Sequence, residues 1–111
     1  MNNLNLENKK GIILIIDDNI NNIKVLANYL NGNDYITLIA KNGESGIERA
    51  RFSKPDLILL DIMMPGIDGF ETCRRLKKDE STKDIPVLFL TALTETSEKL
   101  KGFGVGSGVK P

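Results

Sequence analysis

The chain has 111 residues, which is enough for one compact domain with one hydrophobic core but too few for two. Apolar residues make up 41% of it, and fifteen basic side chains balance fifteen acidic ones, so charge gives no reason to expect nucleic acid or an anionic membrane as a partner. There is no histidine and only one cysteine, which excludes a Ser–His–Asp triad, His-ligated metals and an internal disulfide.

The N-terminal segment 1–10 is polar and rich in asparagine, and we expect it to be a flexible leader. It lacks the apolar core of a signal peptide. No stretch of the chain approaches the roughly 20 apolar residues that a membrane-spanning helix needs. These features predict a cytoplasmic protein without a membrane partner, in which residues 11–111 form the domain.

After this segment, continuous apolar runs alternate with segments in which apolar residues recur at helical spacing. The continuous β-branched run 12–16 is typical of a strand buried on both faces, and apolar residues recur at helical spacing through 19–30. A second strand is expected at 35–40. A short helix is expected at 43–52, and Pro55 prevents its continuation.

The second half of the chain repeats this alternation. A third buried strand is expected at 57–60, followed by a loop at 63–69 that contains proline, glycine and aspartate. Asp68 and Glu71 form an acidic variant of a capping box, which predicts that a helix begins there. The apolar residues that continue that helix at helical spacing are Phe70, Cys73 and Leu76.

The last expected elements are a fourth strand at 87–90 and a helix at 94–103. Strands that alternate with helices indicate βαβ units with a parallel sheet and right-handed crossovers. Continuously apolar strands require helices on both faces of the sheet. The sequence therefore predicts a doubly wound α/β domain, whose site lies outside the carboxyl ends of the strands.

Polar side chains stand at three of these strand ends. Asp17 and Asp18 follow the first strand, Asp61 follows the third and Thr91 follows the fourth. Three carboxylates at one edge repel one another unless one is protonated or a cation binds. Mg²⁺ prefers such oxygen ligands, so the pattern favours a magnesium site.

An aspartate beside Mg²⁺ can act as a ligand, a base or a nucleophile, and carboxylate attack on phosphorus gives an acyl phosphate. The Thr91 hydroxyl and the Lys110 ammonium group could hold the remaining phosphoryl oxygens. Each residue alone has a local explanation as a turn, a cap or a surface side chain. Together at one sheet edge, they favour phosphoryl chemistry.

Four segments resemble the response-regulator receiver family of two-component systems. They are IILIIDDN (12–19), PDLILLDIMMPGIDGFE (55–71), IPVLFLTA (85–92) and the terminal KP (110–111). The third-strand motif, with its Asp, Met-Pro-Gly and Asp-Gly, is highly specific. The resemblance implies a flavodoxin-like parallel sheet in strand order 2-1-3-4-5.

The resemblance also implies a role for each site residue. Asp61 would be the phospho-acceptor, Thr91 would rearrange towards the phosphoryl group and Lys110 would pair with it. Mg²⁺ would be the cofactor, and its protein ligands would be Asp18, Asp17 mainly through water, Asp61 and the backbone carbonyl of Met63. The phosphoryl donor would be a phosphohistidine on a sensor histidine kinase or a phosphotransfer domain.

The C-terminus departs from the family pattern. Gly102-Phe103 is followed by GVGSGVKP, about three residues short of the usual stretch. The fifth strand is therefore expected to be shortened to little more than Val109, without the aromatic switch residue, and the last helix to be missing. This receiver would be C-terminally incomplete. A fused or separate output domain and a homodimer are both open.

Three alternatives compete with a phospho-accepting receiver, which would be a signalling domain that assists its own phosphorylation and dephosphorylation rather than an enzyme. The first is a degenerate receiver that acts only as a protein-interaction scaffold. A haloacid-dehalogenase-like phosphatase would need a second aspartate where Met63 stands. A flavodoxin-type binding module would need Ser, Thr and Gly in the first loop, where Asp17 and Asp18 would repel a phosphate.

Overall fold

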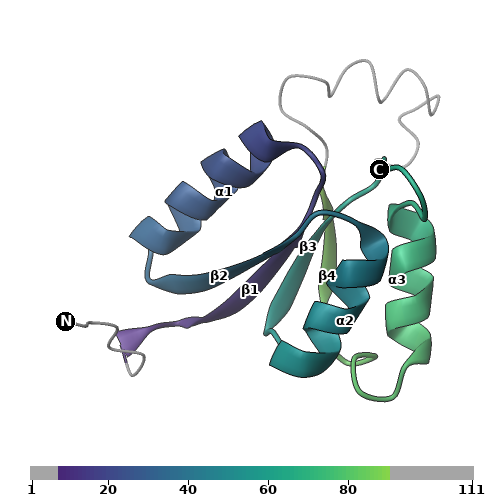
Figure 1. Cartoon of the computed structure of the whole chain (residues 1–111). Helices are drawn as coiled ribbons and strands as arrows, with labels where there is room; N and C mark the ends of the chain where they lie inside the picture. Colours follow the sequence, from purple (N-terminus) through teal and green to yellow (C-terminus); the bar gives the residue numbers. More distant parts are fainter. Residues whose placement is uncertain (1–7, 91–111) are drawn as a thin grey trace.

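The computed structural model describes residues 8–90, which form a four-stranded parallel sheet with helices on both faces (Figure 1). In chain order the elements are β1 (Gly11–Ile16), α1 (Ile20–Gly32), β2 (Tyr35–Ala40), α2 (Gly43–Ser53), β3 (Leu57–Asp61), α3 (Gly69–Lys78) and β4 (Val87–Leu90). The sheet order β2-β1-β3-β4 confirms the flavodoxin-like prediction for these strands. The expected fifth strand and the helix at 94–103 lie outside the described residues.

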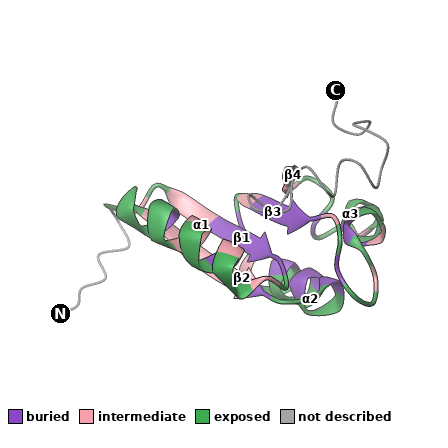
Figure 2. Ribbon diagram, turned by 90° about the horizontal axis from the view of Figure 1, so that it is seen from above, coloured by how far each residue is buried: buried purple, intermediate pink, exposed green. Residues whose placement is uncertain are grey.

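The hydrophobic core lies on both sides of the two central strands. In β1, Leu14 and Ile16 pack into the cluster under α2 and α3, whereas Ile13 and Ile15 pack into the cluster under α1. This alternation follows from the two-residue period of a strand. Because helices cover both faces, β1 and β3 are the most deeply buried strands (Figure 2).

Side-chain caps fix where each described helix begins. The Asn19 side chain accepts from the backbone N–H groups of Asn21 and Asn22, so α1 begins at Ile20, after a connection of only three residues from the end of β1. Asn42 caps α2 in the same way. These short connections place the helix N-termini close to the carboxyl ends of the strands.

Helix α3 packs two of its three predicted apolar residues against the core, Leu76 fully and Cys73 partly, and leaves the third exposed. Of the three apolar residues at helical spacing, only Leu76 is fully buried, and Phe70 is 54% exposed beside the ring of Phe89, with the ring centroids 5.3 Å apart. The buried positions of the first turn are instead Gly69 and Thr72. The helix has this phase because Gly69 lies against the end of β3.

The expected capping box at α3 forms in one direction. The Asp68 side chain accepts from the Glu71 N–H at 2.9 Å. The Glu71 carboxylate accepts from the side chains of Arg74 and Arg75 at 2.7 Å rather than from the Asp68 backbone. The basic residues of the helix thus bind the acid of its first turn.

We expect the Glu71 carboxyl to titrate far below its ordinary range. Hydrogen bonds from Arg74 and then Arg75 lower its pKa from 4.5 to about 2. Since the pKa is lowered in the folded state, the associated stabilisation is present above pH 4.5 and disappears as the pH falls through about 2. A carbon-13 NMR titration measures this pKa, and Arg74→Ala should raise it. A wild-type midpoint at the ordinary value would contradict the prediction.

The N-terminal residues of the described chain join the sheet. The Lys10 backbone N–H donates to the Asp34 carbonyl at 2.8 Å, one residue before β1 begins. Residues 1–7 of the expected leader lie outside the described residues. Between residues 8 and 90, no helix has the length and apolarity that crossing a membrane requires.

Candidate functional site

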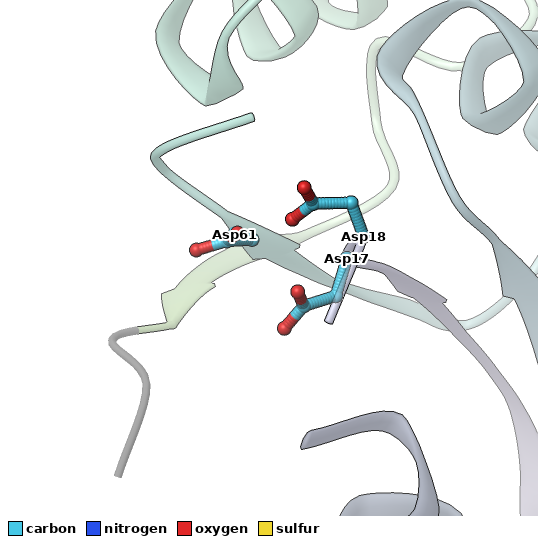
Figure 3. A group of neighbouring side chains, drawn as sticks. All are labelled: Asp17, Asp18 and Asp61. Carbon is cyan, nitrogen blue, oxygen red and sulfur yellow. The ribbon is translucent and has the colours of Figure 1, made fainter. Parts of the chain in front are cut away.

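Three carboxylates meet where β1 and β3 end (Figure 3). Asp17 and Asp18 follow the last residue of β1, and Asp61 is the last residue of β3. One carboxylate oxygen from each residue lies within 4.8 Å of the others. The structure therefore brings together the three acids that the sequence placed at this edge, because β1 and β3 are neighbours in the sheet.

The three carboxylates differ in their access to solvent. Asp17 and Asp61 are each 1% exposed, whereas Asp18 is exposed. Two like charges about 4 Å apart repel by roughly 4 kcal/mol at an effective dielectric constant of about 20. A cation that binds at the exposed side would remove this repulsion. The donor set consists of carboxylate oxygens, which are the hard ligands that Mg²⁺ accepts, so the residues present fit that ion.

The Asp17 carboxylate is held by the start of α1. Its Oδ1 atom accepts from the Asn19 backbone N–H at 2.9 Å, and its Oδ2 atom accepts from the Asn22 side-chain amide at 3.3 Å. The Asp17 backbone N–H donates to the Ala40 carbonyl at 3.0 Å, which extends the pairing of β1 with β2 by one residue. Asn22 was not predicted as a site residue, although its place in the first turn of the next helix was a usable signal.

Gly69 lies against the backbone of Asp61 and Ile62. Its contribution to the site was not predicted from the sequence. A Cβ atom at Gly69 would collide with the Asp61 carbonyl oxygen and would lie 2.7 Å from the Ile62 Cα atom. The Gly69 N–H donates to the Ile62 carbonyl at 2.8 Å. Gly66, with φ at +80°, turns the chain between these points. Only a glycine lets α3 approach the end of β3 so closely.

Of the other three residues expected at the site, the structure describes only Met63. Met63 follows Asp61 by two residues, and its side chain is 49% exposed, whereas Met64 is buried in the core under α2 and α3. The role of the Met63 carbonyl as a metal ligand stays a prediction. Thr91 and Lys110 lie outside the described residues.

Comparison with known proteins gives one consistent family. The response regulator receiver domain family matches residues 13–108. The chain is 40% identical over 95 residues to the response regulator PleD of Caulobacter vibrioides, a match that covers 86% of this chain. That match covers 21% of PleD, so the chain spans about a fifth of this relative.

Solved structures agree with this result. The N-terminal domain of a response regulator receiver protein from Methanoculleus marisnigri JR1 superposes with a TM-score of 0.73 at 37% identity, covering 86% of this chain and 80% of that one. The receiver domain of the sensor histidine kinase PA1611 from Pseudomonas aeruginosa PAO1 has a TM-score of 0.70 at 26% identity, covering 80% and 73%. That structure has a magnesium ion coordinated in its active-site cleft.

Proposed function

Because this chain belongs to the response regulator receiver domain family, whose members accept a phosphoryl group in two-component signalling, we propose that Asp61 is its phospho-acceptor. The observation that supports this assignment is the position of the Asp61 carboxylate. It is buried at the end of the central strand β3, with an oxygen within 4.8 Å of oxygens of Asp17 and Asp18. The proposed nucleophile would therefore lie at the proposed cation site.

The proposed reaction needs few protein groups. A carboxylate oxygen of Asp61 attacks the phosphorus of a phosphohistidine; the new O–P bond forms as the P–N bond breaks. The electron pair of the broken bond stays on the imidazole nitrogen, which takes up a proton, so that a neutral histidine leaves. The product is an acyl phosphate on Asp61. Positioning and charge neutralisation supply most of the catalysis in phosphoryl transfer.

The proposed cofactor is Mg²⁺. Asp18 and Asp61 would hold it directly, Asp17 would hold it mainly through water, and the Met63 carbonyl would complete the protein ligands. When bound, the ion offsets the negative charge of the carboxylates and of the phosphoryl oxygens. We assign Thr91 and Lys110 to the phosphoryl oxygens on the basis of the family motif. The magnesium ion in the PA1611 receiver domain supports this proposal.

The remaining assignments follow from the same function. The donor would be a sensor histidine kinase or a phosphotransfer domain, and the output domain would be fused or separate. The domain would assist its own phosphorylation and dephosphorylation without being an enzyme in its own right. A homodimer, a cytoplasmic location and domain boundaries at residues 1–10 and 11–111 stay predictions.

Incubation with acetyl phosphate tests this function directly. In the presence of Mg²⁺, intact-mass spectrometry should show one added phosphoryl group per chain, and hydroxylamine should remove it because an acyl phosphate is labile to that nucleophile. Chelation of Mg²⁺ should abolish the adduct. A chain that acquires no adduct and binds no Mg²⁺ would instead be the scaffold alternative. Sustained turnover of a phosphate monoester would favour the phosphatase alternative.

A further inference from the structure

A closed set of hydrogen bonds links the first turn of α1 to the buried carboxylate of the site. Asn19 donates its backbone N–H to Oδ1 of Asp17 and accepts the Asn22 N–H on its side-chain oxygen. The Asn22 side-chain amide donates to Oδ2 of Asp17 at 3.3 Å, so hydrogen bonds connect Asp17, Asn19 and Asn22 in a ring. Each oxygen of the Asp17 carboxylate thus has a donor on the α1 side.

This arrangement restricts how Asp17 can point. A carboxylate has about four lone-pair positions, so one donor on each oxygen leaves the others for water or a cation. Asp17 is 1% exposed, so bulk water does not compete strongly for these positions. Asn22 is half-buried in a helical turn that the Asn19 cap fixes. Its amide is therefore a preorganised donor rather than a mobile surface group.

The chemistry of asparagine suits this position. A lysine or arginine here would place a positive charge beside the carboxylates and would compete with a bound cation. A neutral amide donor offsets part of the Asp17 charge while leaving the site anionic. Polar partners that orient metal ligands typically contribute 10- to 100-fold to metal affinity.

We propose that Asn22 is a positioning residue that orients the Asp17 carboxylate for Mg²⁺ binding. This inference rests on the proposed function, since it requires that the three acids bind Mg²⁺. Asn22 itself touches neither the cation nor the phosphoryl group in this assignment. It acts through Asp17, and its removal should weaken Mg²⁺ binding without unfolding the domain.

The test is a Mg²⁺ titration of the full chain, in which the amide chemical shifts are monitored by NMR. Asn22→Leu keeps the size of the side chain but removes the donor, and we expect a Kd on the order of 10-fold higher than in the wild type. Asn22→Ala removes the same donor with a strong helix former and less bulk, and it carries the same expectation if the leucine variant fails to fold. Asn28→Leu is the matched control, because Asn28 is exposed on the same helix.

A double-mutant cycle separates positioning from a general structural role. In an Asp17→Asn background, we expect Asn22→Leu to change the Kd less than 2-fold, because the group that it orients is already altered. Additive effects would overturn the inference, as would a wild-type Kd in both Asn22 variants. The wild-type titration distinguishes failure of this inference from failure of the proposed function. If the wild type binds no Mg²⁺, both fail. If the wild type binds Mg²⁺ and the Asn22 variants bind it equally well, only the inference fails.

Discussion

An Asp61→Asn variant is expected to take up no phosphoryl group from acetyl phosphate in the presence of Mg²⁺. The amide has the shape of the carboxylate, so the end of β3 should keep its packing, but it lacks the charged oxygen that attacks phosphorus. Without Mg²⁺ the variant should be at least as stable as the wild type. It removes one of three like charges whose oxygens lie within 4.8 Å of one another.

Intact-mass spectrometry and thermal melting under chelation measure these two effects. Asp84→Asn is the matched control, because Asp84 is an exposed carboxylate that precedes β4 and lies outside the acidic site. It should acquire the adduct as the wild type does. An undiminished adduct in Asp61→Asn would show that another residue accepts the phosphoryl group.

The described fold could be predicted largely from apolar periodicity. The strands β2 and β4 have the expected bounds, and β1 and β3 differ from the expected ranges by one residue. Short, continuous apolar runs are the expected pattern for strands that helices cover on both faces of a sheet. Helix phase was harder to predict: Phe70 lies at helical spacing yet is 54% exposed. The close approach of Gly69 to β3 decides that phase, and apolar periodicity carries no information on backbone contacts.

The acidic site was predictable for a topological reason. Asp17, Asp18 and Asp61 end neighbouring parallel strands, and parallel strands bring their carboxyl ends to one edge. The residues that support these acids were not predicted. Asn22 reaches Asp17, five residues earlier, because only three residues connect the end of β1 to the start of α1. Such support depends on side-chain geometry, which spacing alone does not determine.

Gly69→Ala is expected to destabilise the domain by about 2 to 3 kcal/mol, which corresponds to roughly 10 to 20 °C in Tm for a domain of this size. The added Cβ would collide with the Asp61 carbonyl oxygen and would lie 2.7 Å from the Ile62 Cα atom. Both are backbone atoms of the central strand or its end, so neither can move cheaply. Thermal and urea unfolding under chelation measure the loss.

Gly32→Ala is the matched control, because it makes the same change at the end of α1, where a Cβ meets no atom within 4 Å. There alanine should raise stability by about 0.5 to 1 kcal/mol through its lower backbone entropy in the unfolded chain. The opposite signs separate the contact from the general effect of the substitution. The Gly69 variant should also accept the phosphoryl group more slowly at temperatures where it is folded, because a displacement at the end of β3 would change the position of Asp61 relative to Asp17 and Asp18. Equal stability of both variants would show that α3 can retreat from β3 without cost.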